Sequence, residues 1–590
     1  MEAKQFASLR RRYRAGKSRR TGYESQWDEI EYFTGPLREE GNTYSSPQVS
    51  GSGQQKRKDL WDLTGIESRE KLSSSMYQSI IPTSLRWFLA SFRKSMLNRD
   101  TEAKTWLDQE SEDTWGDIQD SNFNTEMARF FQQITGPGNA FVAMEPLPPL
   151  IVDDTDDKGR PTVKEEYAGV EFTFLPLEEC FFERDRKGGV STFWRRKMWL
   201  PSEAVDFFEE HGLPVPTDIQ EKYEAGATTL IEFVYCVFPR KEILKKYERR
   251  ARYPLAPDKR PWGCVWWRED TGEQIGEENG YYEKPIFYSP WSVTAGSMWG
   301  HGPGNIALPT VKYINARMEQ VQSASEMALQ PPMQIAERAA LGDLTVNFQP
   351  GTATIVGDVN GVKELHQQPR VDISIELIEG DRAQVRRVFH ADELTMKDSP
   401  AMTAMEAQIR YELMNRLLGK TLSLLQENAL GPIVLTIMQI RARMKAGNPM
   451  PKKVRAAGGV FNLDFQGPLA RAQRTDEVAA IERGATFVGG LAQIWPEARA
   501  GMDPIKAIKL AFARLGVPSE LIPSDQQIQQ TIKQMNDQAS AMAGAATAKD
   551  AAAAEKSRAE ASQLGPVAGI RAAYPQLPPT PPLGPSGLPA

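Results

Sequence analysis

Tryptophan is unevenly distributed along this chain of 590 residues, and this limits the folds open to it. Twelve of the 13 tryptophans precede residue 300, and only Trp495 follows it. The first half also carries short aromatic and β-branched runs, which favour strands. The second half is rich in Ala, Gln, Met and Leu and has helical periodicity. The sequence therefore predicts an α+β protein with strands mainly in its first half and a largely helical second half.

Local patterns divide the chain further. The first 35 residues predict a basic amphipathic helix that ends at Gly35-Pro36, and residues 60–98 also have helical periodicity. Residues 371–391 are ambiguous, because their apolar positions first alternate as in a strand and then follow helical spacing. Short strands are expected at residues 140–144, 230–238, 263–267 and 284–289.

The clearest expected helix runs over residues 403–446. Thr403 and Glu406 form a capping-box pattern at its start. Gly431 and Pro432 lie inside this helix, and Pro432 has no backbone N–H to donate. We therefore expect the helix to kink at this pair.

Charge and composition exclude several classes of protein. The chain has 71 basic and 77 acidic residues, a net charge of −6, which argues against a general polyanion binder. Three cysteines cannot form a disulfide framework and indicate a reducing compartment. No run of 18 apolar residues occurs, so no membrane-spanning helix is expected. The basic start lacks the apolar stretch of a signal peptide.

The sequence contains no pattern typical of a catalytic, cofactor-binding or metal site. The four histidines are far apart in the sequence. The Gly-Lys-Thr at residues 419–421 is part of the phosphate-binding loop pattern, but it falls within the expected long helix. The backbone N–H groups there are already hydrogen-bonded in the helix and cannot bind a phosphate. The acidic run 153–159 partly matches a calcium loop, but Lys158 stands where a ligand should be, which favours a hairpin turn. No enzyme activity is predicted.

Basic residues are concentrated in the N-terminal helix, where Arg10, Arg11, Arg12 and Arg14 follow one another closely. Such a cluster can contact DNA phosphates. It can also pair with acidic groups of a neighbouring subunit, or form a solvated helix face. A DNA-binding protein using this helix is thus an alternative function, although the acidic total charge speaks against it.

Several short stretches stand out by their order and spacing. They are TGPGNAFV at residues 135–142, MWGHGPG at 298–304 followed by ALP at 307–309, MTAME at 402–406 with Arg410, LQE at 425–427 and LGPIV at 430–434. Together they resemble the head-to-tail connector (portal) proteins of short-tailed, T7-like bacteriophages. The resemblance does not extend to the proline-rich end after Gly565.

The resemblance implies a ring of twelve identical subunits at one capsid vertex of the virion, assembled in the host cytoplasm. Double-stranded DNA would pass through its channel, and the implied partners are terminase, a tail adaptor, and the major capsid and scaffolding proteins. No membrane partner and no cofactor are implied. A channel lined by acidic or neutral groups would repel phosphates, which suits the net charge of −6 per subunit.

The family's parts can be assigned to segments of this chain. They are an N-terminal arm and β-rich wing (1–303), stem helix 1 (304–330), an α/β clip (331–370), stem helix 2 (371–391), a channel loop (392–402), a long kinked helix with a return to the wing (403–469), a helical crown (470–540) and an Ala-rich then Pro-rich tail (541–590). The resemblance implies that the ambiguous residues 371–391 form a helix. The expected channel-loop residues are Glu393, Lys397 and Asp398, and Arg386 and Arg387 could touch DNA or a neighbouring subunit.

Overall fold

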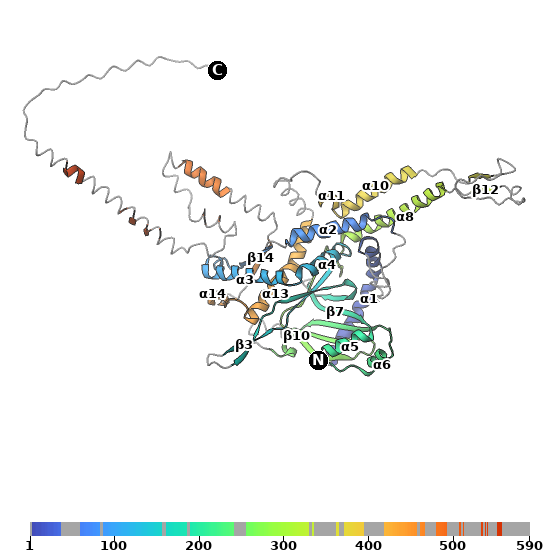
Figure 1. Cartoon of the computed structure of the whole chain (residues 1–590), viewed down its shortest axis with the longest axis horizontal. Coiled ribbons are helices and arrows are strands. Elements are labelled where there is room, and N and C mark those ends of the chain that lie inside the picture. The colour runs from blue at the N-terminus through green and yellow to red at the C-terminus, as the bar shows by residue number, and fades with distance from the viewer. Residues whose placement is uncertain are drawn as a thin grey trace, which may run out of the picture. The chain divides into compact units, whose positions relative to one another are not determined.

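The computed structural model describes 3–36, 60–82, 86–155, 161–185, 189–240, 255–294, 296–329, 333–335, 362–364, 371–394, 418–456, 461–465 and 480–491, with shorter helical pieces between 507 and 556. The chain divides into two units, Met1–Ser519 and Glu520–Ala590. All elements discussed below belong to the first unit. They confirm the predicted mixture of helix and sheet (Figure 1).

A five-stranded antiparallel sheet forms the aromatic part of the chain, in the order β10-β9-β8-β7-β6. Its strands are β6 (Cys180–Arg184), β7 (Val190–Trp199), β8 (Ile231–Pro239), β9 (Trp262–Arg268) and β10 (Gln274–Tyr281). The strands expected at residues 230–238 and 263–267 are thereby confirmed as β8 and β9. Two short helices, α5 (Pro201–Glu210) and α6 (Thr217–Glu224), share an apolar cluster with β8 and β10.

The predicted N-terminal helix is α1 (Ala3–Thr34), and it ends next to Gly35 as expected. Leu9 and Tyr13 of α1 pack with Phe181, Trp194 and Trp267 of the five-stranded sheet. Since Tyr13 is fully buried there, the apolar side of α1 is covered by its own chain.

A second sheet has three strands in the order β11-β2-β5. They are β2 (Asn139–Pro146), β5 (Val170–Leu175) and β11 (Ile286–Pro290), so the strands expected at 140–144 and 284–289 are confirmed. Helix α4 (Phe123–Thr135) packs on this sheet. The chain between β2 and β5 forms the hairpin of β3 (Leu150–Thr155) and β4 (Pro161–Glu166), which confirms the hairpin expected around residues 153–159; the turn, 156–160, lies outside the described residues.

Helices gather around the other side of the core. They are α2 (Thr64–Ile80), α3 (Thr101–Asp120), α8 (Pro303–Leu329), α10 (Val371–Val388), α11 (Ala391–Leu394), α13 (Gly431–Met444) and α14 (Lys452–Ala456). None of those seven, nor any other helix in the described part, is long and apolar enough to cross a membrane.

Of the ambiguous residues 371–391, Val371–Val388 form helix α10, as the resemblance implied, and Ala391 begins the separate helix α11. The positions with helical spacing, Ile378 and Val385, are buried in the main apolar cluster. Ile375, which suggested a strand, is 57% exposed. Packing against α2 and α8 therefore selects the helical pattern.

The expectation of helix throughout residues 60–98 is wrong in its second half. After α2, residues Phe88–Phe92 form strand β1, which pairs with β14 (Phe461–Phe465). The two strands are more than 350 residues apart in the sequence, so the local pattern could not reveal the pairing. A second small pair joins β12 (Met333–Ile335) and β13 (Val362–Glu364). Short 3-10 turns occur at Leu97–Arg99, Leu177–Glu179 and Pro257–Lys259.

Candidate functional site: the arginine contacts and the glycine junction

Three arginines of α1, Arg10, Arg12 and Arg14, contact residues in or next to the five-stranded sheet of their own chain. Arg12 donates to the Glu183 carboxylate at 3.1 Å and to the Thr192 hydroxyl at 2.8 Å. Arg14 donates to the Glu269 carboxylate at 2.6 Å, and Arg10 donates to the Glu269 carbonyl oxygen at 3.2 Å. These three arginines thus anchor α1 on the sheet.

Arg11 differs from its neighbours. It is exposed, and no ion pair joins it to another residue of the described ranges. It stays a prediction that the cluster of Arg10, Arg11, Arg12 and Arg14 contacts DNA or a second subunit. Of these four, Arg11 is the one whose guanidinium is exposed and free of an ion pair within the described ranges.

The most buried cation of α1 is Arg20. Its Nε donates to Glu24 at 2.8 Å, and its terminal nitrogens donate to the carbonyl oxygens of Leu177, Glu178 and Cys180 at 2.7–3.0 Å. Burial lowers the pKa of Arg20, and the nearby Glu24 carboxylate partly offsets this. A buried charge is tolerated only when it is paired and fully hydrogen-bonded, so this set of contacts makes α1 an integral layer of the fold.

The two glycine-rich motifs meet in space, although about 160 residues separate them. A Cβ on Gly138, whose φ is +80°, would lie 2.1 Å from the Gly302 nitrogen, and one on Gly304 would lie 2.6 Å from the Gly136 carbonyl oxygen. Only glycine permits such an approach of two backbones. We call this contact of residues 136–139 with residues 300–304 the glycine junction.

Asn139 holds the glycine junction together. Its Nδ2 donates to the carbonyl oxygens of Pro137 and Gly300, and its Oδ1 accepts from the Gly300 N–H at 2.7 Å and the Tyr288 hydroxyl at 2.8 Å. The side chain is fully buried and every hydrogen-bonding position is used. The junction therefore sets the position at which α8 begins.

Arg69 links the glycine junction to the helices. It donates to Glu31 of α1 at 2.8 and 3.0 Å and to the Gln132 carbonyl oxygen of α4 at 2.7 Å. A Cβ on Gly136 would lie 2.3 Å from the Arg69 Cζ, so this glycine makes room for the guanidinium. Sequence reasoning missed Arg69 because its partners lie on two other helices, α1 and α4, that are distant in the sequence.

A second arginine, Arg441 of α13, lies among three carboxylates of α3. It donates to Glu110 at 2.9 Å, Asp113 at 2.7 Å and Asp117 at 2.8 Å. Burial raises the pKa of Glu110 and of Asp117, although Arg441 acts in the opposite direction. The spacing of the acids, three and four residues apart, brings all three to one side of α3.

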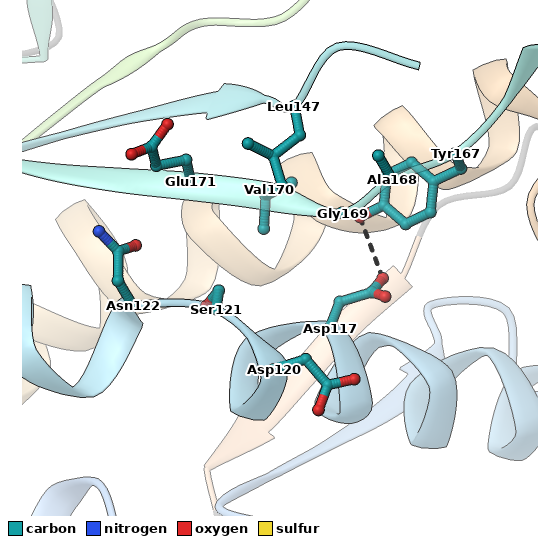
Figure 2. A pocket seen from close by; sticks show the side chains of 10 residues that line it. All are labelled: Asp117, Asp120, Ser121, Asn122, Leu147, Tyr167, Ala168, Gly169, Val170 and Glu171. Atoms are coloured by element: carbon teal, nitrogen blue, oxygen red, sulfur yellow. Dashed lines mark hydrogen bonds between the residues drawn. The ribbon is translucent and has the colours of Figure 1, made fainter. Parts of the chain in front are cut away.

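Asp117 also borders a pocket of about 370 Å³, where it accepts from the Tyr167 hydroxyl at 3.1 Å (Figure 2). The pocket lies between the end of α3 and the start of β5, and its wall includes Asp120 and Glu171. Within the described ranges no group of three or more His, Cys, Asp or Glu side chains is arranged to hold a metal ion.

Arg386 of α10 and Glu393 of α11 have partners close by in the sequence. Arg386 donates to Glu379 at 3.1 Å and to Asp392 at 3.4 Å, and Glu393 lies 2.8 Å from His390. Arg387 is exposed. Lys397 and Asp398 lie outside the described residues.

The helix around Gly431 and Pro432 changes its hydrogen bonding. Residues Gln426–Leu430 form a π-helical turn, in which the Gly431 N–H bonds to the Gln426 carbonyl oxygen. Pro432 follows directly, in the first turn of α13. π-turns of this kind commonly accompany helix bends. The kink itself stays a prediction, and residues 403–417 of the expected helix lie outside the described residues.

Taken together, these contacts describe an α+β protein in which paired charges and backbone contacts join distant segments of one chain. A sequence model of the family described as "Bacteriophage head to tail connecting protein" matches residues 7–522. The chain belongs to this family. It is a component of the phage virion at the junction of head and tail.

Individual relatives agree with the family. The chain is 23% identical to a portal protein of Salmonella phage epsilon15 over 566 residues, which covers 94% of this chain and 95% of the relative. It is 23% identical to a probable portal protein of Bordetella phage BPP-1, with coverage of 93% and 94%. A solved chain from the virion of a native gene transfer agent particle aligns with a TM-score of 0.26 and 11% identity, over 67% of this chain and 89% of that chain.

Proposed function

We propose that the chain is a portal subunit that assembles into a ring of twelve at one capsid vertex. The ring is the conduit for packaging and ejection of double-stranded DNA and the platform for terminase and then a tail adaptor. The observation that carries this proposal is the family match over residues 7–522, together with two portal relatives that align over nearly their whole length.

The segments of a portal fit the observed elements. Residues 1–303 form the arm and wing and contain α1 and both larger sheets. Helices α8 and α10 are the two stem helices, and the β12–β13 pair belongs to the clip between them. The long helix returns through α13 to the wing, where β14 pairs with β1. Residues 392–402 are the channel loop, residues 470–540 the crown, and residues 541–590 a tail beyond it.

Exposed apolar side chains on the stem support assembly. Ile306 and Tyr313 of α8 and Ile375 and Leu377 of α10 are all at least half exposed in the single subunit. Apolar surface of this kind is commonly covered in a protein–protein contact. A ring covers it with the adjacent subunit, through two different faces of each chain.

The electrostatics suit a conduit. Each subunit carries a net charge of −6, and Arg386 is paired with Glu379 and Asp392. The basic residues Arg386, Arg387 and Lys397 supply weak, transient contacts with the DNA backbone, whereas the carboxylates of Glu393 and Asp398 in the channel loop repel its phosphates. The balance lets DNA slide, since tight binding needs many unpaired cations. In this role the protein catalyses no reaction. Its further partners are the capsid and scaffolding proteins of the head.

The test is the mass and shape of the purified full-length protein. We expect closed rings with a mass of about twelve times 66.0 kDa by native mass spectrometry, and rings with a central hole in end-on electron micrographs. A protein that stays monomeric or dimeric at every concentration tested contradicts the proposal. Sequence-specific DNA binding by such a monomer would instead support a DNA-binding function of α1.

A further inference from the structure

We infer that the acidic outer surface of α5 and α6 docks on the exposed basic side of α1 in the adjacent copy of this chain. The inference rests on the proposed ring and names one of its contacts. It starts from the five-stranded sheet, whose two faces carry helices of opposite charge.

The alternation of side chains along the strands shows that α1 and α5 lie on opposite faces of this sheet. Successive residues of a strand point to opposite faces. In β8, Val234 belongs to the apolar cluster that includes α1, whereas Phe233 belongs to the cluster of α5 and α6. The neighbouring strand β9 repeats the division, with Trp267 packed in the cluster of α1 and Trp266 in that of α5 and α6. The sheet therefore lies between the two sets of helices.

The outer side of α1 is basic. Residues 3–22 contain eight basic and no acidic residues. Lys4, Arg11 and Arg19 are exposed and form no ion pair with residues that the structure describes. Their spacings of seven and eight residues bring them to one side of the helix, away from Tyr13, which is buried against the sheet. A single subunit thus leaves this side of α1 uncovered.

The outer side of α5 and α6 is acidic. Residues 201–224 contain seven acidic residues and one basic residue. Phe208 of α5 is buried in the cluster beneath the helices, whereas Asp206, Glu209 and Glu210 are exposed. In the part of the chain that the structure describes, these three carboxylates of α5 form no ion pair. This surface is therefore complementary in charge to the basic side of α1.

One subunit cannot satisfy this complementarity alone, because its own sheet separates the two surfaces. Two complementary surfaces on opposite faces of one chain define a heterologous contact, which repeats from copy to copy and closes into a ring at a fixed rotation. The occupant of the basic side of α1 is thus the α5–α6 surface of a second copy.

A charge exchange tests the contact. Glu209→Lys with Glu210→Lys reverses the end of α5, and Arg11→Glu with Arg19→Glu reverses α1. All four side chains are exposed, so the subunit should keep its fold. Each pair of changes alone should raise the protein concentration needed for half-maximal ring formation by about tenfold. All four together should restore it to within about twofold of the unmodified protein.

The matched control is Asp120→Lys with Glu171→Lys. It changes the charge by the same amount as the reversal on α5, at two exposed acids beside the pocket between α3 and β5, and should leave ring formation unchanged. Far-UV circular dichroism verifies folding of every variant. Should a reversal disturb the fold, Glu209→Gln with Glu210→Gln and Arg11→Gln with Arg19→Gln replace it, with a smaller loss of ring formation expected.

Three results would overturn the contact while the portal function stands. The first is that either reversal forms rings as the control does. The second is that the four changes together fail to restore rings. The third is that reversal of α1 lowers only the affinity for DNA, in which case DNA occupies its basic side. If the unmodified protein forms no rings at all, the proposed function itself fails.

Discussion

Helix α1 with its sheet and the helix pair α8–α10 use their side chains in opposite ways. On α1, Tyr13 and Trp27 are buried, and Trp27 packs edge-on against Trp299 with 5.0 Å between the ring centroids. On α8 and α10, Tyr313 is 50% exposed and Ile375 is 57% exposed. The first region is complete within one chain, whereas the second leaves apolar surface for a neighbour.

This difference separates stability from assembly. Substitutions on the inner side of α1 should lower the free energy of unfolding of the subunit, because they remove buried hydrogen bonds, ion pairs or packing contacts. Substitutions on the exposed side of the stem should leave the subunit folded and affect only the ring. The following predictions test this separation through the free energy of unfolding of the unassembled subunit, measured by urea denaturation.

The largest loss should follow Arg69→Ala. The change removes the arginine from a buried ion pair with Glu31, and breaking one side of a buried pair costs about 3–5 kcal/mol. Lys312→Ala is the control, because Lys312 pairs with Glu29 where both side chains are nearly half exposed, so this change should cost at most about 1 kcal/mol. Equal losses in the two variants would show that Arg69 does not hold α1, α2 and α4 together.

A smaller loss should follow Tyr13→Phe. The ring still fills its place against Phe181, but the hydrogen bond from the hydroxyl to Glu232, 2.6 Å long, disappears. A hydrogen bond to a charged group contributes about 1.5–3 kcal/mol, and Lys17 continues to pair with Glu232, so the lower end is expected. An unchanged free energy of unfolding would mean that the hydroxyl adds nothing to the anchoring of α1.

Helix α3 should show two opposite responses to pH. Bonds from Lys453 and from the Ala103 N–H lower the pKa of Asp100, so its contribution to stability is present at neutral pH and is lost as the pH falls through its lowered pKa. Burial raises the pKa of Glu110, so as the pH falls the folded state protonates this carboxylate before the unfolded state does. Protonation removes the cost of keeping the charged carboxylate buried, so this contribution favours the folded state in acid.

The measurement compares two variants with the unmodified protein between pH 7 and pH 3. Asp100→Ala removes a helix N-cap and should cost about 0.5–2 kcal/mol at neutral pH, with the difference shrinking in acid. Glu110→Gln should behave differently. Acid protonates Glu110 in the unmodified protein and removes the cost of its buried charge, whereas the glutamine of the variant does not titrate. The stability of the variant relative to the unmodified protein should therefore be lowest in acid. Parallel pH profiles for all three proteins would refute both assignments.

The smallest effect on stability should follow Ile375→Ser. The side chain is exposed on α10, so the free energy of unfolding should change by no more than about 0.5 kcal/mol. Ring yield, counted in electron micrographs, should nevertheless fall, because the stem then presents less apolar surface. Ile378→Ser is the contrasting variant, since Ile378 is buried and its change should unfold the subunit. Normal ring yield with Ile375→Ser would remove this residue from the subunit contact.

Much of the fold follows from local patterns. Helix α1 ends next to the predicted Gly35, and strands β8 and β9 lie within two residues of the expected bounds. Such elements are predictable because aromatic and β-branched runs or helical spacing, bounded by Gly and Pro, act within a short window. The arginine cluster was likewise visible, but whether its members pair within the chain was not.

By itself the sequence determined the α+β class, the helical second half and the family motifs around the two glycine-rich runs. Only the tertiary structure decided that these runs meet at Gly138 and Gly302 and that β1 pairs with β14. The physical reason is the range of the interactions. Periodicity and turn chemistry act between near neighbours, whereas backbone contact, strand pairing and buried charge pairs depend on segments that only the folded chain brings together.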